Sequence, residues 1–464
     1  MRFPVHILSL CVLSSLGLAA PAHSDLESRQ LIGGLLKGVD GTLETVVGGL
    51  LGTLRKAIDS GDRDKTLDIL HVLEPTKKHK NFEETFAALE KISKSKPKTI
   101  IDYSAQLIVN GLISGNTLDL FAYAKGLVSA QNGSNNKNRN PPKEVYPTVA
   151  NCDASYTTSE AKLRAAIHIP PTFTYGEKPP VILFPGTGST GFTTYRGNFI
   201  PLLTDVEWAD PVWVNVPVLL LEDAQVNAEY AAYALNYIAS LTKRNVSVIA
   251  WSQGNIDVQW ALKYWPSTRK VTTDHVAISA DYKGTILANI GGATGLINTP
   301  AVVQQEAGST FINTLRSNDG DSGYIPTTSL YSSLFDEVVQ PQEGTGASAY
   351  LLDARHVGVT NAEVQKVCAG KLGGSFYTHE SMLANPLTFA LAKDALTHEG
   401  PGKISRLDLA DVCNRSLAPG LGLEDLLVTE NAVIIAALSL VLYLPKQVDE
   451  PAIKQYALEA ASTC

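Results

Sequence analysis

A serine flanked by small residues at the end of an apolar run is the strongest chemical signal in this sequence. The stretch VSVIAWSQGN, from Val246 to Asn255, is typical of a buried strand that leads into a tight turn around Ser252. It matches the nucleophile motif G-x-S-x-G except at the first position, where Ala250 replaces glycine. Because backbone segments pass closely around such a serine, the turn needs small neighbours, and Ala250 and Gly254 meet that need. The motif alone leaves a catalytic and a structural serine equally open.

A nucleophilic serine also needs a histidine to take its proton and a carboxylate to orient that histidine. In sheets that carry this motif, the chain order is serine, acid, histidine. Asp336, in SSLFDEVVQPQ, follows a predicted strand, which is the expected position for the acid. His275 opens a predicted strand and is therefore interpreted as structural. Spacing does not choose among the remaining downstream histidines, which are His356, His379 and His398.

A glycine loop, PGTGSTG, follows the first predicted strand and allows two interpretations. Gly186, Gly188 and Gly191 satisfy the dinucleotide fingerprint G-x-G-x-x-G, which also requires an acid at the end of the next strand. That strand ends in VNVPVLLL and has no acid. We therefore expect the loop to form one wall of an oxyanion hole, with the backbone N–H groups of Thr187 and Gln253 as donors and the Thr187 hydroxyl as a further candidate.

The elements around these residues alternate between strand and helix. Apolar strands are predicted at 181–184, 212–218, 246–251, 275–280 and 328–335, with helices at 222–241 and 255–265. This alternation predicts an α/β fold with a mostly parallel sheet covered by helices on both faces. The apolar run 432–444 is too short to span a bilayer and predicts a buried helix whose one side lines a cleft.

The N-terminal third of the chain has a different organisation. Residues 1–22 have the layout of a secretory signal peptide, and residues 25–130 show helical periodicity interrupted by glycines. Residues 131–150 are interpreted as a polar linker, and residues 151–464 as the catalytic domain. We therefore expect a secreted, extracellular protein with a helical N-terminal extension or pro-region.

Composition narrows the possible partners. The 464-residue chain is 44% hydrophobic and carries a net charge of −8, which argues against nucleic acid. After removal of the signal peptide, an even number of cysteines remains, which favours disulfides, with three pairings open. Glycosylation sequons begin at Asn132, Asn245 and Asn414. The sequence indicates no metal, no cofactor and no transmembrane segment, and we expect a monomer.

Six stretches in this order together resemble the family of Candida antarctica lipase B: LFPGTGSTG, QVNAEYAAYALN, AWSQGNIDVQW, ADYKGTILA, SLYSSLFDEVVQPQ and YLPKQVDEP. The resemblance extends from about Val181 to the C-terminus. It implies an α/β-hydrolase fold and a serine lipase or esterase that hydrolyses carboxylic esters, triacylglycerols among them. The helical segment before residue 130 has no counterpart in the best-known member of the family.

The resemblance also implies roles for individual residues. Ser252 in WSQG corresponds to the nucleophile, Asp336 in DEVVQPQ to the acid and His379 in FYTHESM to the base. The oxyanion donors correspond to Thr187 and Gln253. The residues that correspond to pocket positions are Asp281 near the acyl chain, Trp251 at the alcohol side, and Val338 and Val441 on the cleft walls.

Two disulfides follow from the same resemblance. The family's central bridge corresponds to Cys368 and Cys413, which leaves Cys152 and Cys464 as the second pair. As an alternative function, we consider a dedicated esterase or acyltransferase for a specialised metabolite. In that hypothesis the N-terminal helices act as a lipid–water interface module or as an inhibitory module. Residues 288–305, rich in glycine and small side chains, are a candidate mobile cover.

Overall fold

The computed structural model describes residues 43–126, 129–333 and 335–458. Contacts divide the chain into two compact units, residues 1–49 and residues 50–464. The predicted signal peptide and Cys464 lie outside the described residues, so the signal peptide and the Cys152–Cys464 pairing stay predictions. Helices from the N-terminal third and the whole sheet belong to the same unit, residues 50–464.

Within the described residues, seven strands form one sheet in the order β1-β3-β2-β4-β5-β6-β7. All neighbouring strands are parallel except β1, which pairs antiparallel with β3. The strands are β1 Ile167–His168, β2 Pro180–Phe184, β3 Asp210–Val214, β4 Val246–Trp251, β5 Thr272–Ile278, β6 Thr327–Tyr331 and β7 Val359–Glu363. Every residue of β2, β3, β4 and β6 is buried, as expected for a parallel sheet covered on both faces.

The strand predicted at 275–280 spans Thr272–Ile278, and two other predicted strands end four residues earlier than the sequence suggested. The strand predicted at 212–218 stops at Val214, because Pro217 begins the short 3-10 helix η2, Pro217–Leu220. The strand predicted at 328–335 stops at Tyr331, after which the Ser332 hydroxyl donates to the carbonyl of Tyr377, 2.7 Å away. Both errors came from apolar runs that continue past the end of the sheet.

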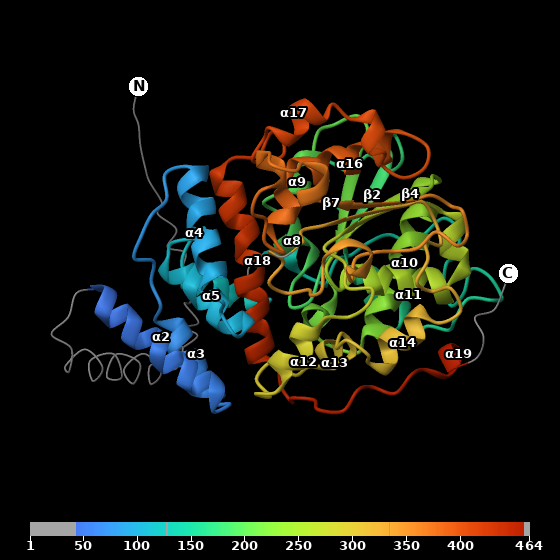
Figure 1. Cartoon of the computed structure of the whole chain (residues 1–464). Helices are drawn as coiled ribbons and strands as arrows, with labels where there is room; N and C mark the ends of the chain where they lie inside the picture. Colours follow the sequence, from blue (N-terminus) through green and yellow to red (C-terminus); the bar gives the residue numbers. More distant parts are fainter. Residues whose placement is uncertain (1–42, 127–128, 334, 459–464) are drawn as a thin grey trace, which may run out of the picture. The chain divides into compact units, whose positions relative to one another are not determined.

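The helices lie before, between and after the strands (Figure 1). They are α2 Leu43–Asp59, α3 Arg63–His71, α4 Phe82–Lys94, α5 Ile100–Val109, α6 Thr117–Ala124, α7 Glu160–Ala165, α8 Gly191–Tyr195, α9 Phe199–Leu203, α10 Ala224–Thr242, α11 Gly254–Tyr264, α12 Ile286–Gly292, α13 Pro300–Gln304, α14 Thr310–Arg316, α15 Val364–Val367, α16 Pro386–Thr397, α17 Leu409–Cys413, α18 Leu423–Leu442 and α19 Gln455–Leu458.

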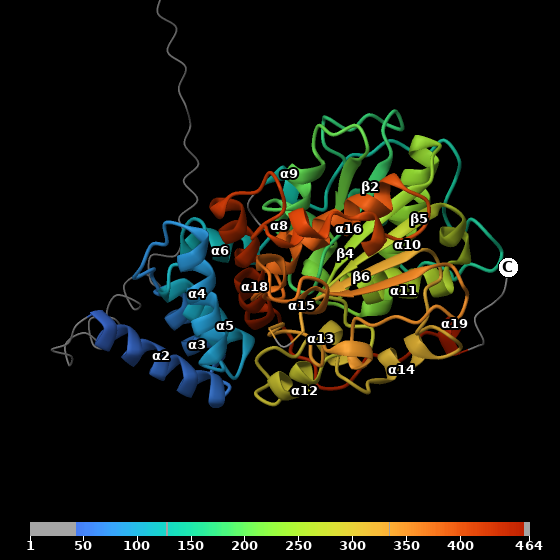
Figure 2. The ribbon, with the colours of Figure 1, turned by 45° about the horizontal axis from the view of Figure 1, so that its top comes forward.

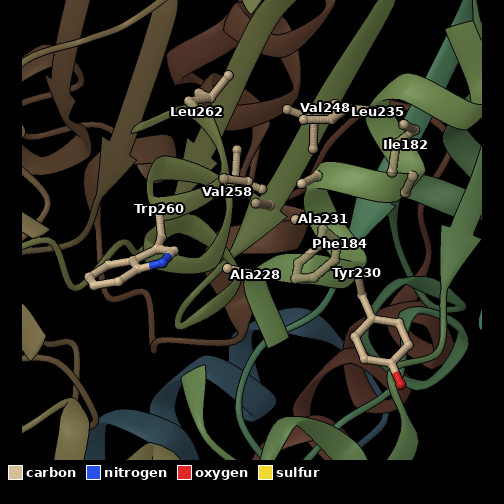
Figure 3. Packing of buried hydrophobic residues seen from close by; sticks show 14 of the residues in the cluster. Ile182, Phe184, Ala228, Tyr230, Ala231, Leu235, Val248, Val258, Trp260 and Leu262 are labelled. Carbon is tan, nitrogen blue, oxygen red and sulfur yellow. The ribbon is translucent and has the colours of Figure 1, made fainter. Parts of the chain in front are cut away.

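Alternate residues of each strand point to opposite faces of the sheet, and each face has its own hydrophobic core. Ile182 and Val248 belong to one core, together with side chains of α10 and α11 (Figure 3). Leu183 and Ile249 belong to the other core, with side chains of α9 and α16. Figure 2 shows the strands between these helices. The sheet is therefore fixed from both sides, and its strand ends are rigid points of attachment.

Helix α18 begins at Leu423, nine residues before the apolar run from which it was predicted. It is long and apolar enough to cross a membrane by length and composition, but most of its side chains are buried inside the protein. The N-terminal helices α5 and α6 pack against it (Figures 1 and 2). The Asn431 side chain donates to the carbonyl of Ser114 at 2.9 Å and accepts from its N–H at 3.2 Å. Tertiary contact with the N-terminal helices therefore explains the burial of α18.

A disulfide joins Cys368 at the end of α15 to Cys413 in α17, across 45 residues of sequence. Of the three sequons, those at Asn245 and Asn414 have exposed asparagines. The Asn132 side chain is only 3% exposed, and its oxygen accepts hydrogen bonds from Thr190 and Thr193. The predicted sequon at Asn132 is therefore buried, because its polar linker folds onto the loop around α8.

Candidate active site

Ser252 lies at the sharp turn between β4 and α11, and its backbone is left-handed, with φ +55°. A residue with a Cβ atom adopts this conformation at a cost of about 1–3 kcal/mol, and the surrounding structure must hold it there. One such hold is the hydrogen bond from the Ser252 N–H to the carbonyl of Ile278 at the end of β5, 3.0 Å long. The conformation turns the side chain away from the strand direction and out of the sheet.

Glycines allow the backbone to approach this turn closely. A Cβ atom at Gly254 would lie 2.3 Å from the carbonyl oxygen of Pro185, and one at Gly186 would lie 2.7 Å from the Ser252 Cβ. Both distances are too short for carbon. Ala250, by contrast, is accommodated inside β4 with its methyl group fully buried. The departure from the motif thus falls at the position where the strand has room for a methyl group.

Thr187 and Gln253 approach each other from the loop after β2 and from the start of α11. The Thr187 hydroxyl lies 2.7 Å from the side-chain oxygen of Gln253 and 3.1 Å from that of Gln305. In the part of the chain that the structure describes, neither the Thr187 nor the Gln253 backbone N–H donates to a protein acceptor. Two backbone donors beside Ser252 are therefore available to a ligand.

His379 and Asp336 form a buried pair at the ends of loops that follow β6 and β7. The His379 Nδ1 donates to Asp336 Oδ2 over 2.9 Å, and the His379 side chain is 1% exposed. The other carboxylate oxygen of Asp336 accepts the N–H groups of Val338 and Val339, at 3.0 and 2.7 Å. Within the described residues His379 Nε2 has no hydrogen-bond partner. The carboxylate therefore fixes the tautomer with the proton on Nδ1 and leaves Nε2 as a base.

Two opposing effects set the pKa of His379. Burial lowers it, but the charge and hydrogen bond of Asp336 and the charges of Glu337 and Asp281 together raise the pKa above its usual value. The ring also stacks at a tilt on Trp251, with centroids 4.9 Å apart, and the Trp251 indole N–H donates to the His379 carbonyl at 3.1 Å. The residue before Ser252 thus holds the histidine.

A cluster of buried carboxyl groups beside His379 was missed by the sequence analysis. Glu337 Oε2 accepts the His379 backbone N–H at 3.0 Å, and Glu380 is fully buried in the same cluster. Burial, together with the charge of Glu337, raises the pKa of Glu380 well above its usual range, and burial, together with the charge of Asp336, also raises the pKa of Glu337. Burial also raises the pKa of Glu430 to about 8, and the Tyr103 hydroxyl of α5 lies in the same cluster.

Ser252 and His379 line one cavity of about 250 Å³. Its walls are mostly apolar and come from α12, α13 and α18, and from the segment between α4 and α5. They include the predicted pocket residues Trp251 and Val338. They also include seven residues of the N-terminal region that the sequence analysis did not connect with the site: Ser93, Lys96, Pro97, Lys98, Thr99, Ile100 and Tyr103.

Two of the predicted pocket residues do not line this cavity. Val441 is buried in α18, where Val433, Ala436 and Leu440 face the cavity at three- and four-residue steps. Its position, one residue after Leu440, turns it about 100° away around the helix. Asp281 is fully buried and is not among the residues that line the cavity, and burial raises the pKa of this carboxyl to about 7.

The other downstream histidines lie elsewhere. His356 is exposed, and His398 is about half exposed and pairs with Asp394 at 3.2 Å. His275 is buried in β5 and bonded to Asn255 at 3.1 Å. None of the three lines the cavity that contains Ser252. Sequence spacing did not choose among the downstream histidines. In the structure, His379 is the one of these four that lines the same cavity as Ser252.

Helix α18 packs directly over the glycine loop and leaves no room there for a dinucleotide. A Cβ atom at Gly188 would lie 2.6 Å from the Ser439 hydroxyl and 2.7 Å from the Ala436 Cα, so α18 fills the space over the glycine loop. Among the residues that the structure describes, no group of three or more His, Cys, Asp or Glu side chains is arranged to hold a metal ion.

Comparison with known proteins identifies the family. Lipase B of Pseudozyma antarctica is 34% identical over 283 residues, which make up 60% of this chain and 79% of that protein. This chain belongs to the lipase B family. Its sheet, flanked by helices, has the α/β-hydrolase fold that the family resemblance implied. The protein is a carboxylic ester hydrolase.

The crystal structure of Aspergillus fumigatus lipase B matches 88% of this chain and 99% of its own, with 43% identity and a TM-score of 0.79. Residues 151–464 make up about two thirds of the 464 residues, so this match includes residues before 151. A Bacillus licheniformis lipase matches at 17% identity with a TM-score of 0.36 over 51% of this chain and 53% of its own. No protein-family model matches the chain.

The backbone of Pro185 lies so close to Gly254 that a methyl group added at Gly254 should lower the activity of this enzyme. Gly254→Ala should lower kcat/KM for a soluble ester at least about 10-fold, because the added carbon collides with the Pro185 carbonyl and shifts the Ser252 turn. The matched control is Ala250→Gly, which restores the full motif and should keep activity near wild type, at a stability cost of about 1 kcal/mol. Equal activities for the two variants would contradict the packing argument.

Proposed function

We propose that this chain is a secreted serine lipase or esterase that hydrolyses carboxylic esters, triacylglycerols among them, through Ser252, His379 and Asp336. The observation that carries the proposal is the unpartnered Nε2 of His379 in the cavity that also contains the strained Ser252. The Asp336 carboxylate orients the ring, and family membership supplies the reaction class.

The proposed reaction has two halves. Ser252 Oγ attacks the carbonyl carbon of the ester while His379 Nε2 takes the hydroxyl proton, and the N–H groups of Thr187 and Gln253 stabilise the negative oxygen. The C–O bond to the alcohol then breaks, and the alcohol leaves with the proton from His379. Water, or another alcohol, attacks the acyl-enzyme with the same base and releases the acid or a new ester.

The walls of the cavity support an apolar acyl group as substrate. Leu287, Val302, Val338 and Leu440 are among the apolar lining residues. Its volume of about 250 Å³ is slightly smaller than the roughly 300–1,000 Å³ of pockets that enclose drug-sized ligands. One acyl chain of moderate length is therefore the best fit, with Trp251 on the alcohol side and Asp281 beneath the acyl side.

Secretion is supported by a disulfide in the catalytic domain and by the sequence of the N-terminus. The Cys368–Cys413 disulfide is typical of an oxidising compartment, in agreement with a signal peptide at residues 1–22. A second bridge between Cys152 and Cys464 belongs to the same proposal. The helical region 25–130 then precedes a catalytic domain at 151–464.

The first test compares wild type with Ser252→Ala on a triglyceride emulsion and on a soluble short-chain ester. Wild type should cleave both, and the variant should lose roughly 10⁴-fold or more of kcat on each, because the nucleophile is gone. Cleavage of the soluble ester alone by wild type would restrict the function to that of an esterase. Retained activity in the variant would refute the proposed nucleophile.

The environment of His379 predicts the pH dependence. His379 must be neutral to accept the serine proton, so kcat/KM falls as pH falls through its raised pKa. The acid limb should therefore lie above the usual imidazole pKa of about 6.5. Glu337→Gln removes one of the negative charges that raise the pKa, and the limb should move to lower pH.

The matched control for this pH profile is Glu83→Gln on the exposed face of α4, which should leave the limb unchanged. The profile is measured as kcat/KM for a soluble ester whose own ionisation lies outside the range. A limb that stays in place in Glu337→Gln, or moves upward, would contradict the assignment of Glu337 as an ionised neighbour.

A second candidate function rests on the N-terminal residues in the cavity wall. Ile100 and Tyr103 of α5 line the same cavity as Ser252, so we propose that the helices before residue 130 limit the length of substrate that can enter. This favours, as the alternative, an esterase or acyltransferase for a particular metabolite, with the N-terminal helices as an inhibitory or lipid-interface module.

Shortening the wall tests this alternative. Ile100→Ala should raise kcat/KM for a long-chain ester about 10-fold relative to a short-chain ester, because the lost methylene groups lengthen the space for the acyl chain. Leu118→Ala is the control, since Leu118 is 60% exposed on α6 and does not line the cavity. An unchanged chain-length profile in Ile100→Ala would remove the N-terminal helices from the account of specificity.

A further inference from the structure

The side chain of Asn255, three residues after Ser252, ties together two backbone carbonyl groups at the ends of β4 and β5. Its Nδ2 donates to the carbonyl oxygens of Ser252 and Ile278, each 3.0 Å away. The Asn255 backbone N–H also donates to the Ser252 carbonyl at 3.0 Å. The Ile278 carbonyl in turn accepts the Ser252 N–H. A closed set of hydrogen bonds therefore holds both the N–H and the C=O of Ser252.

His275 fixes which way the Asn255 amide points. With Nδ2 facing two carbonyl oxygens, Oδ1 must face the ring of His275, where it lies 3.1 Å from Nε2. A flipped amide would point its oxygen at two other oxygens, so the observed orientation is the one that hydrogen bonding allows. His275 Nε2 must then carry the proton and donate. Burial lowers the pKa of His275 to about 3, which keeps the ring neutral with this single proton.

Because the peptide group is rigid, the hydrogen bonds that orient the Ser252 carbonyl also orient the N–H group of Gln253. The Ser252 C=O and the Gln253 N–H belong to one planar trans peptide group, so they point in opposite directions along a fixed line. When Asn255 fixes the carbonyl oxygen, it also fixes the direction of the Gln253 N–H. That N–H has no acceptor among the described residues and faces the site as a proposed oxyanion donor.

We propose that Asn255, oriented by His275, is a positioning residue that fixes the peptide group between Ser252 and Gln253 and so aims the nucleophile and one oxyanion donor together. Asn255 is fully buried, so it acts on the ester only indirectly, through the backbone groups of Ser252 and Gln253. The inference rests on the proposed roles of Ser252 and Gln253. It adds to them a buried hydrogen-bonded pair, His275 and Asn255, which is joined to the backbone of Ser252 and Ile278.

The test measures kcat, KM and the rate of labelling by a p-nitrophenyl alkylphosphonate, which forms a stable tetrahedral adduct with a reactive serine. Asn255→Ala should lower kcat roughly 10- to 100-fold and slow labelling in parallel, with KM within about 3-fold of wild type, because an oxyanion donor acts in the transition state. The control is Asn236→Ala. Asn236 is a buried residue of α10 that donates to the Ser267 hydroxyl at 2.9 Å and does not line the cavity. The substitution should lower the melting temperature and leave kcat unchanged.

Two substitutions at His275 separate the orientation of the Asn255 amide from the stability of the protein. They also test the proposal if Asn255→Ala does not fold. His275→Leu removes the donor to Asn255 and should lower kcat as Asn255→Ala does. His275→Gln retains an N–H donor and should recover most of that loss. Equal kcat values and labelling rates for wild type, Asn255→Ala and His275→Leu, with lower melting temperatures in the variants, would overturn the proposal and leave Asn255 a structural residue.

Labelling of Ser252→Ala distinguishes the two levels of the argument. If Ser252→Ala is still labelled at the wild-type rate, the proposed nucleophile is wrong and the positioning role falls with it. If Ser252→Ala is inert while Asn255→Ala and His275→Leu react like wild type, the nucleophile stands and only the positioning role is refuted.

Discussion

The left-handed turn at Ser252 is the constraint on which the rest of the site depends. That conformation is unfavourable for a serine, and it persists because β4 lies between β2 and β5 in a sheet packed on both faces. The end of β5 supplies the carbonyl of Ile278, and the loop after β2 supplies Gly186, which lets the backbone approach. The strain is therefore stored locally and opposed by the cohesion of the whole sheet.

Electrostatics around His379 follow from the same burial. Asp336 and Glu337 bind the ring and the backbone N–H of this one residue, so negative charge accumulates where water is excluded. Burial and the neighbouring Glu337 raise the pKa of the nearby carboxyls of Glu380 and Glu430, so these groups lose their protons less readily than exposed carboxyls. The negative charges of Asp336, Glu337 and Asp281 therefore raise the pKa of His379.

Helix α18 lies between the N-terminal helices α5 and α6 and the glycine loop after β2. One side of it covers the glycine loop, where Ser439 and Ala436 lie against Gly188, and another side receives α5 and α6. The Arg63 side chain donates to the Val441 carbonyl near the end of the helix at 3.0 Å. Because the N-terminal helices and the cavity share this helix, a change in the packing of one alters the wall of the other.

The sequence by itself determined the alternation of strands and helices, the serine turn and the pairing of Cys368 with Cys413, the last through family resemblance, since these depend on local patterns and on motif order. Spacing alone left three histidines open and only the family resemblance pointed to His379, because spacing along a chain says nothing about which loop returns to a strand end. The tertiary structure brings His379 and Ser252 into one cavity, and it alone decided that Val441 turns away from that cavity and that N-terminal residues form part of its wall. Each of these depends on contacts between residues more than a hundred positions apart or on the rotation of a helix, and neither leaves a periodic signal in the sequence.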